Sequence, residues 1–305
     1  MSRIHEALRK VEQDRIASPG TGPENGHAEQ VWVPELVPPA ATETSGFSGP
    51  PVAAMPAAAS SFPALLASCP RSDWTPDVTM LFFGTDDQKP GTEQFRTLRA
   101  RLLQLREKQP LKKILVTSAL REEGRSFVSA NLAQALARQQ GWRSLLIDGD
   151  LRYPGLHSLL GVSAEPGLSD YLRGEAEEGE ILRRGQMENL FLLPAGREAV
   201  DPAGLAASSR WKLLLQRMEA LFDWIIVDTP AAIPVSDASV LAAACDGVLI
   251  VVRSQATPAD AASKMRQQFS DMRLLGVVLN GTQAQPSTQW DYQRGILSTS
   301  RYEGF

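Results

Sequence analysis

The sequence predicts an α/β fold with a doubly wound, mainly parallel sheet and helices on both faces. From about residue 80 onwards, short apolar runs alternate with helical stretches. The runs are continuous rather than alternating with polar residues, which indicates strands that are buried on both faces. Strands of this kind, each followed by a helix, are typical of parallel sheets that lie between two helical layers.

The first predicted element of this domain is a helix that begins near Thr92. It carries apolar side chains at helical spacing, namely Phe95, Leu98, Leu102 and Leu105. The predicted strands are Lys113–Ser118, Ser144–Asp148, Leu190–Leu193, Trp224–Asp228, Val248–Val252 and Gly276–Leu279, and further helices are predicted at 126–140, 208–221, 237–244 and 259–271. Ligands of such sheets bind at the carboxyl ends of the strands, so the residues that follow each strand are the candidates for function.

Composition places the chain among globular proteins and excludes several classes. It has 305 residues and a net charge of -4, which gives no global attraction to nucleic acid. Two cysteines exclude a disulfide framework and a site with several Cys ligands, and three histidines argue against a His-rich metal site. No apolar run approaches the roughly 18 residues that span a bilayer, and the charged start lacks the apolar core of a secretory signal. We therefore expect a soluble, cytoplasmic protein.

Proline content separates the two halves of the chain. Twelve of the 21 prolines lie within the first 90 residues. We interpret residues 18–84, which are rich in Ala and Pro without a periodic apolar pattern, as a disordered linker; the alternative is a proline-rich part of the fold. Residues 1–17 carry an amphipathic stripe and are predicted to form a docking helix; the alternative is a fraying terminus. The folded domain is assigned to 85–283, followed by a flexible, tyrosine-bearing tail at 284–305.

The loop after the first predicted strand matches part of a phosphate-binding pattern. The pattern is G-x-x-x-x-G-K-[ST], placed between a strand and a helix. Gly124 and Ser126 stand at the second glycine and the hydroxyl, whereas Ala119 and Arg125 replace the first glycine and the lysine. In this context, backbone N–H groups would bind phosphates and Ser126 would bind Mg²⁺. The alternative is an ordinary strand-to-helix turn.

Carboxylates end two further strands. Asp148 and Asp150 leave the second strand in the sequence Asp-Gly-Asp-Leu-Arg, and Asp228 ends a third. Beside a phosphate loop, such carboxylates would hold Mg²⁺, directly or through water, or accept a proton from a nucleophile. One Asp at a strand end is more simply a turn or a helix cap. Three strand ends that carry Gly-Arg-Ser, Asp-x-Asp and Asp together favour a nucleotide site.

With these motifs, the chain resembles the bacterial tyrosine kinases (BY-kinases) of capsule and exopolysaccharide biosynthesis, in their stand-alone cytoplasmic form and with a degenerate Walker A loop. These kinases have a phosphate-loop (P-loop NTPase-type) fold. The resemblance extends over about residues 85–283. The matching segments are Glu93–Arg99, which reads E-x-x-R-x-x-R, then Leu145–Arg152, Gly167–Leu172, Leu193–Gly196, Ile225–Asp228 and Gly276–Asn280, and the start Met1–Leu8 is similar to that of a stand-alone subgroup.

The resemblance implies that ATP and Mg²⁺ are the cofactors of a protein-tyrosine autokinase. Asp150 would be the base that activates a tyrosine hydroxyl, assisted by Asp148 and Arg125. The nucleotide would contact Gly124, Arg125, Ser126, Phe127 and Asn280, and Mg²⁺ would be bound by Ser126, Asp148 and Asp228.

The resemblance also implies partners. Glu93, Arg96 and Arg99 would form ion pairs between the subunits of a homo-oligomeric ring, and Tyr292 and Tyr302 in the tail would accept phosphates. A membrane-bound polysaccharide co-polymerase on a separate chain would activate the protein and recruit it to the inner face of the membrane.

Three departures from the family pattern leave the activity open. Arg125 replaces a compact lysine with a planar guanidinium, Glu122 and Glu123 place two carboxylates where an anion should bind, and the tail has two tyrosines rather than a cluster. An autokinase that regulates polysaccharide polymerisation and export is the first hypothesis. A pseudokinase or scaffold with weak or no nucleotide turnover is the second. A partitioning-type ATPase is the third, and Leu120 argues against it because those ATPases carry a lysine there.

Overall fold

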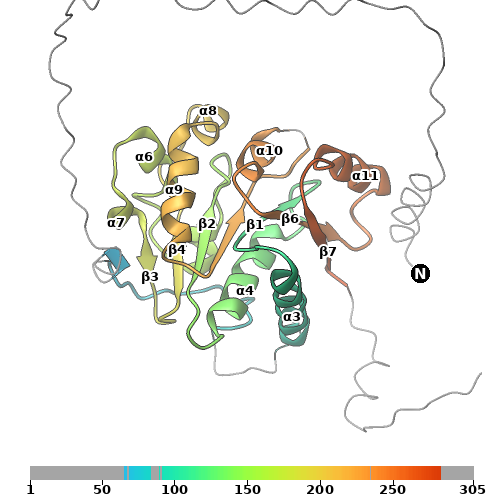
Figure 1. Ribbon diagram of the computed structural model, residues 1–305, viewed down its shortest axis with the longest axis horizontal. Helices are drawn as coiled ribbons and strands as arrows, with labels where there is room; N and C mark the ends of the chain where they lie inside the picture. Colours follow the sequence, from blue (N-terminus) through green and yellow to red (C-terminus); the bar gives the residue numbers. More distant parts are fainter. Residues whose placement is uncertain (1–64, 67–68, 84–88, 90, 234, 283–305) are drawn as a thin grey trace, which may run out of the picture. The chain divides into compact units, whose positions relative to one another are not determined.

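The computed structural model describes residues 65–66, 69–83, 89, 91–233 and 235–282. The predicted docking helix, most of the predicted linker, and Tyr292 and Tyr302 lie outside the described residues. Within the described part, the chain forms a seven-stranded sheet with the order β3-β4-β2-β5-β1-β6-β7 (Figure 1). Neighbouring strands are parallel except for β3 and β4. The predicted doubly wound, mainly parallel sheet is confirmed.

The elements follow the predicted order closely. The strands are β1 Lys113–Ser118, β2 Ser144–Asp148, β3 Arg183–Arg184, β4 Leu190–Leu193, β5 Trp224–Asp228, β6 Gly247–Arg253 and β7 Leu274–Asn280. The helices are α3 Thr92–Lys108, α4 Arg125–Ala137, α5 Leu156–Leu160, α6 Leu168–Arg173, α7 Glu178–Ile181, α8 Pro202–Ala206, α9 Ser209–Glu219, α10 Asp237–Ala242 and α11 Ala259–Gln268. β3 and the helices α5 to α8, which have two to six residues each, were not predicted.

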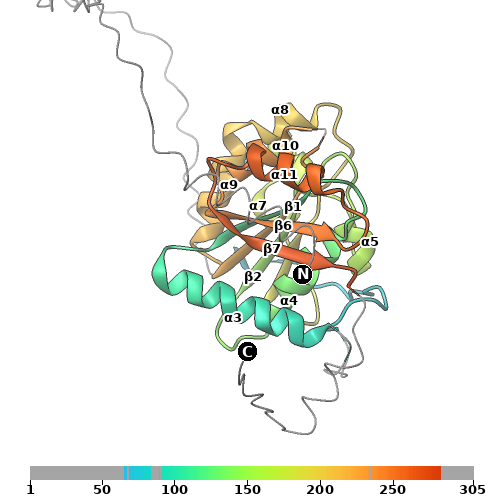
Figure 2. The ribbon, with the colours of Figure 1, turned by 90° about the vertical axis from the view of Figure 1, so that its right-hand side faces the viewer.

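Two helical layers enclose the sheet. α3 and α4 cover one face, and α9, α10 and α11 cover the other (Figures 1 and 2). α4 lies between the sheet and α3, and all ten of its residues from Val128 to Ala137 are buried. Its sequence is rich in Ala and Ser, and these small side chains let the helix approach the sheet closely. The position of α4, and with it the loop that precedes it, is therefore fixed from all sides.

Residues 69–83, which the sequence places in the linker, belong to the core. Trp74, Met80 and Phe82 expose 3%, 1% and 2% of their surface. The backbone N–H of Leu81 donates to Asn131 Oδ1 of α4 at 2.9 Å. The linker prediction is therefore corrected for this segment, which is a proline-containing part of the fold. Apolar residues without periodicity gave no signal that they would be buried.

The same segment also extends one edge of the sheet. The backbone N–H of Ser72 donates to the carbonyl of Arg184 at 3.0 Å, next to an isolated parallel bridge between Arg71 and Arg184. Gln186 Nε2 donates to the carbonyl of Trp74 at 3.1 Å. β3, which is only two residues long, is thus paired on both sides, with β4 and with this segment.

No helix in the described ranges combines the length and the apolar character that a membrane crossing requires.

The docking of residues 69–83 can be tested through Cys69. Burial raises the pKa of this thiol to about 11, so its thiolate fraction at pH 8 is about a hundredfold below that of an exposed cysteine. We predict that iodoacetamide labels Cys69 about a hundredfold more slowly in the native protein than in urea, as read by peptide mass spectrometry. Trp74→Ala should accelerate labelling, because losing a buried Trp side chain costs about 3–5 kcal/mol.

Cys245 is the internal control for this experiment. Burial raises its pKa to about 12, so it should stay slow in Trp74→Ala as long as the sheet persists. Equal labelling rates of Cys69 in native and unfolded protein would show that the segment is not docked.

Candidate active site

The residues that the sequence predicts for catalysis and for binding of nucleotide and metal lie at or near the carboxyl edge of the sheet. Parallel strands end at one common edge, toward which the β6 and β7 arrows point in Figure 2. Asp148 ends β2 and Asp228 ends β5, and the two residues are partners in the register of these neighbouring strands. The predicted phosphate loop, residues 119–124, follows β1 at the same edge and leads into α4.

Asp228 is held by two hydroxyls of α4. Ser126 Oγ donates to Asp228 Oδ2 at 2.6 Å, and Ser129 Oγ donates to Oδ1 at 3.0 Å. Burial raises the pKa of this carboxyl to about 6, against the opposing effects of Arg125 and the two hydroxyls. Ser126 and Asp228, predicted from separate motifs, are therefore brought together as a pair of oxygen ligands.

Asp148 is held by backbone N–H groups from the segment that follows β2. Its Oδ2 accepts from Gly155 N at 3.2 Å and Leu156 N at 3.0 Å, and its Oδ1 accepts from Asp150 N at 3.2 Å. Burial, and then the charge of Asp228, raise the pKa of Asp148 to about 8. The raised pKa favours the protonated form of Asp148, and the three backbone donors tie its carboxyl to the segment from 150 to 156.

Gly149, between the two aspartates, is required by a close approach of backbones. Its N–H donates to the carbonyl oxygen of Asp228 at 2.8 Å. A Cβ atom at Gly149 would lie 2.8 Å from that same oxygen, closer than real Cβ atoms come. The Asp-Gly-Asp sequence thus lets the end of β2 pass directly against the end of β5.

Arg125 and Asp150 form an ion pair. Arg125 Nη2 lies 2.6 Å from Asp150 Oδ2, and the side chains expose 11% and 2% of their surface. Arg125 Nε donates to the carbonyl of Thr229, while Asp150 Oδ1 accepts from Tyr153 N at 2.9 Å. The guanidinium that stands at the lysine position of the loop is thus held by the predicted base. A phosphate bound by Arg125 would compete with Asp150 for the same donor.

Arg152, the last residue of the Asp-x-Asp-x-Arg cluster, ties this segment to α10. Its Nε lies 2.5 Å from Asp237 Oδ2, and its Nη2 donates to Oδ1 at 3.1 Å. Such a two-point contact fixes both side chains in a plane. Sequence reasoning missed Asp237, which is 85 positions away and has no motif of its own.

The loop carboxylate Glu123 does not face the site as an unpaired charge. Its side chain is buried, with 3% exposed, and both oxygens accept hydrogen bonds from within the protein. Glu123 is therefore satisfied by donors of the protein itself and does not point into the site. One of the two donors, the hydroxyl of Thr257, lies beyond β6, so the sequence of the loop alone could not predict this contact.

The two remaining nucleotide candidates, Asn280 and Phe127, have partners in different elements. Asn280, the last residue of β7, donates its Nδ2 to the Glu123 carbonyl at 2.9 Å. Gly124 is in the left-handed region at φ 87°, and a Cβ there would lie 2.0 Å from Asn280 Nδ2. The ring of Phe127 packs against Phe95 of α3, with 6.0 Å between centroids. A contact of Phe127 with a nucleotide would therefore come from its backbone N–H.

The residues present fit a magnesium nucleotide. Ser126 and Asp228 offer the oxygen ligands that Mg²⁺ prefers, and Arg125 offers the planar donor that suits a phosphate. Among the described residues, no group of three or more His, Cys, Asp or Glu forms a metal site.

The predicted oligomerisation residues all lie on α3. Glu93 and Arg96 form an ion pair within the helix. Arg99 Nη1 donates to the carbonyl of Ala135 in α4 at 2.8 Å, a contact inside the same chain. Arg99 thus helps to hold α3 on α4.

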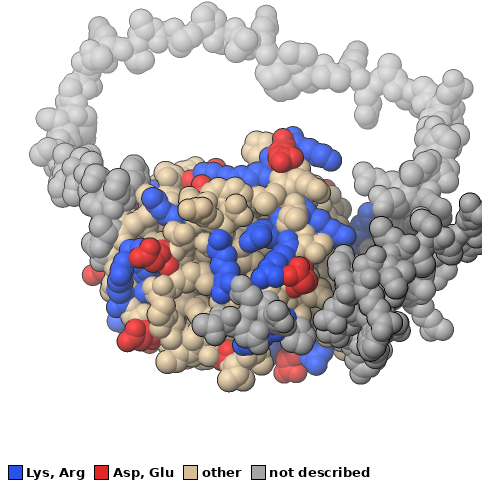
Figure 3. Space-filling model, turned by 90° about the horizontal axis from the view of Figure 1, so that it is seen from below, with Lys and Arg blue, Asp and Glu red and all other residues tan. Residues whose placement is uncertain are grey.

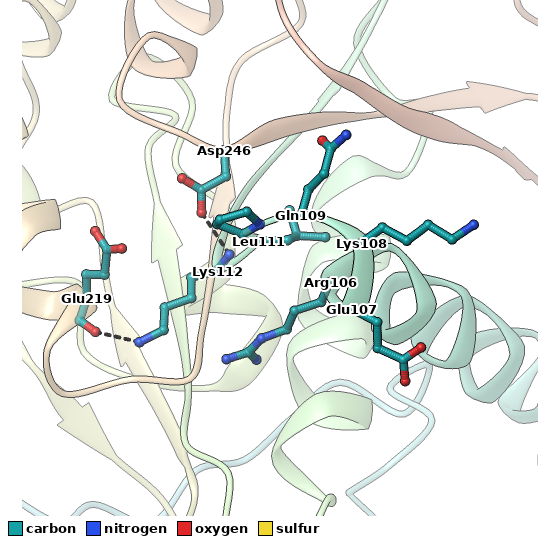
Figure 4. A pocket seen from close by; sticks show the side chains of 9 residues that line it. Arg106, Glu107, Lys108, Gln109, Leu111, Lys112, Glu219 and Asp246 are labelled. Carbon is teal, nitrogen blue, oxygen red and sulfur yellow. Dashed lines mark hydrogen bonds between the residues drawn. The ribbon is translucent and has the colours of Figure 1, made fainter.

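A hollow at the opposite edge of the sheet belongs to the scaffold. Figure 4 shows it at the amino end of β1, and it is lined by Arg106, Glu107, Lys108, Gln109, Pro110, Leu111, Lys112, Glu219 and Asp246. Lys112 Nζ donates to the Glu219 carbonyl at 3.0 Å, and Asp246 Oδ2 accepts from Lys112 N at 2.7 Å. These bonds tie the start of β1 to the elements beside it, so the charges there have a structural role.

No model of a protein family matches the chain, but individual proteins do. It is 31% identical over 210 residues to the tyrosine-protein kinase YwqD of Bacillus subtilis, covering 68% of this chain and 88% of that protein. It is 33% identical over 184 residues to the tyrosine-protein kinase CpsD of Streptococcus agalactiae, covering 59% and 80%.

Solved structures show the same likeness. The kinase domain of the Escherichia coli tyrosine kinase ETK is similar at 31% identity and a TM-score of 0.59, covering 63% of this chain and 78% of that one. The chimerical protein CapA2B2 is similar at 27% identity and a TM-score of 0.64, covering 72% and 97%.

The buried carboxyl of Asp148 predicts how stability changes with pH. Its pKa is about 8 in the folded protein and about 3.9 in an unfolded chain. The folded state therefore binds an extra proton between these values, and the contribution of this group to the free energy of unfolding falls as pH rises through that window. We predict that, in EDTA without nucleotide, Asp148→Asn flattens the decline of Tm between pH 5 and pH 8.

Asp260→Asn is the matched control, since Asp260 is 72% exposed on α11 and should leave the slope of Tm against pH as in wild type. A wild-type slope retained in Asp148→Asn would contradict the prediction.

Proposed function

The chain belongs to the family of bacterial tyrosine kinases, and we propose that it is an ATP-dependent autokinase that phosphorylates tyrosines of its own tail. The observation that carries the proposal is the contact between Arg125 and Asp150, at 2.6 Å. It supports a site in which the predicted base stands directly beside the predicted phosphate loop. The family assignment favours a kinase or a kinase-derived scaffold over a partitioning ATPase.

In the proposed reaction, each residue of the site has one task. Bound Mg-ATP would supply the phosphoryl group and much of the charge neutralisation that transfer requires. Ser126 and Asp228 would hold the metal side of the site, and Asp148 would keep the segment that carries Asp150 in place. Asp150 would accept the proton of the attacking tyrosine hydroxyl. Little further protein chemistry is needed, because phosphoryl transfer depends mainly on positioning and charge.

Arg125 would move between two partners during this reaction. A guanidinium binds phosphate oxygens through two parallel hydrogen bonds, so it can replace lysine as the cation of the loop. When Arg125 turns to the phosphates, Asp150 loses its ion pair and becomes available as a base. Coupling of this kind would keep the base occupied until nucleotide arrives.

The same contact favours one alternative function. If Arg125 stays on Asp150 when nucleotide is offered, the protein would be a scaffold with the kinase fold and little or no turnover. The two functions differ in one measurable property, the transfer of phosphate.

We propose that the biological setting is polysaccharide polymerisation and export. Among the relatives, the succinoglycan biosynthesis transport protein ExoP of Rhizobium meliloti is 34% identical to 62% of this chain, which covers 25% of ExoP. A relative whose similar region is a quarter of a longer transport protein supports a membrane-bound polysaccharide co-polymerase as partner. That partner would be a separate chain and would recruit this protein to the inner face of the membrane.

A homo-oligomeric ring is proposed through α3. The helix carries five basic residues, Arg96, Arg99, Arg101, Arg106 and Lys108, and two acidic ones, Glu93 and Glu107. Figure 3 shows Lys and Arg side chains gathered on the face where α3 lies. Glu93 is 75% exposed, so it is accessible to a basic side chain of a second subunit.

The proposed activity predicts phosphate transfer, which is measured as the intact mass of the protein after incubation with Mg-ATP. Wild type and Arg125→Lys should gain phosphate, whereas Asp150→Asn should lose at least about a hundredfold in rate, the usual contribution of a positioned base. The double variant Tyr292→Phe, Tyr302→Phe is the control for the acceptors and should stay unmodified. Phosphate on Asp150→Asn would contradict the role of the base. If no form of the protein gains phosphate, even when the membrane-bound co-polymerase is supplied as activator, the scaffold function would be favoured.

The proposed ring predicts that two substitutions on α3 have different effects, one on the mass of the oligomer and one on the stability of the fold. Glu93→Ala should lower the mass measured by light scattering without changing the free energy of unfolding. Arg99→Ala should lower that free energy by about 1–2 kcal/mol, because it loses a hydrogen bond to α4. A wild-type protein that is monomeric with Mg-ATP would contradict the ring.

A further inference from the structure

We propose that Glu123 and Thr257 are positioning residues that hold the phosphate-binding loop in its working shape. The inference rests on the proposed nucleotide-binding function and adds to it residues outside the predicted motifs. It starts from a juxtaposition: a buried loop carboxylate meets a buried hydroxyl that lies 134 positions later in the chain.

The Glu123 carboxylate connects two separate segments. Its Oε2 accepts from the backbone N–H of Leu120 at 2.8 Å, across the loop. Its Oε1 accepts from the hydroxyl of Thr257, in the turn between β6 and α11. Thr257 is itself fixed, because its Oγ1 accepts from the backbone N–H of Arg253 at 2.9 Å. The side chain of Glu123 therefore joins the loop to the end of β6.

Two further bonds hold the backbone around this carboxylate. Asn280 Nδ2 donates to the carbonyl of Glu123 at 2.9 Å, and Arg253 Nη1 donates to the carbonyl of Glu122 at 2.9 Å. Glu122 has a φ of 63°, a left-handed conformation that L-residues other than Gly adopt at a cost. Side chains from the ends of β6 and β7 thus keep the loop in a conformation that it would not adopt alone.

This arrangement matters because the loop would bind phosphate through its backbone N–H groups. Such a site binds well only if those groups already point in the right directions. A buried carboxylate is costly unless hydrogen bonds satisfy it, and here both of its oxygens have donors. The loop lacks the first glycine and the lysine of the usual pattern. Its shape therefore depends more strongly on the hydrogen bonds from Thr257, Arg253 and Asn280.

Thr257→Val tests the proposal in the full-length chain. It removes the hydroxyl at nearly constant volume, whereas Thr257→Ser keeps the hydroxyl and should rescue. Thr92→Val is the matched control, because Thr92 is also buried and its Oγ1 has no hydrogen-bond partner among the described residues. Two properties are measured: hydrogen exchange of the Leu120 amide without nucleotide, and the Kd of fluorescently labelled Mg-ADP.

We expect Thr257→Val to raise Leu120 exchange and the Kd about tenfold each, the effect of one hydrogen bond to a charged group. Thr257→Ser and Thr92→Val should stay near wild type in both. Unchanged Leu120 exchange in Thr257→Val would overturn the proposal, and so would faster exchange with an unchanged Kd. If wild type binds no Mg-ADP, the proposed function fails, and so does the role of Glu123 and Thr257 in nucleotide binding. The hydrogen-exchange data then decide separately whether Thr257 holds the loop.

Discussion

Two aspartates that lie side by side at the buried ends of neighbouring strands are the constraint on which the site depends. The register of β2 and β5 sets Asp148 against Asp228, and neither has access to water. Carboxyls in such a place must be satisfied by donors that come to them. Ser126 and Ser129 approach from one side and the N–H groups of the segment after β2 from the other. The positions of α4 and of Asp150 follow from this requirement.

Charge balance explains why the departures from the usual loop are compatible with the fold. Arg125 is wider than lysine, and its guanidinium finds Asp150 and the Thr229 carbonyl within the site. Glu123 adds a negative charge to the loop but turns it inward, where hydrogen bonds satisfy it. The guanidinium of Arg125 thus lies against the carboxylate of Asp150. The carboxylate of Glu123 is turned away from the space where an anion would bind.

Sequence reasoning predicted what is local and missed what joins distant segments. Continuous apolar runs identified the long strands, and the acids that end them identified Asp148, Asp150 and Asp228. Trp74, Met80 and Phe82 escaped because buried residues in irregular segments have no period. Pairs such as Arg152 with Asp237 escaped because the partners lie 85 positions apart, and one sequence carries no trace of such a pairing.

The packing of residues 69–83 also has a consequence for the order in which the protein is made. This segment leaves the ribosome early, but its partners come later: Asn131 is 50 positions after Leu81, and Gln186 is 112 positions after Trp74. Until then, the apolar side chains of Trp74, Met80 and Phe82 lack the partners that α4 and the strands of the sheet provide. Exposed apolar surface in a growing chain is prone to misassembly. The segment would therefore dock late in synthesis, closing the edge of a sheet that has already formed.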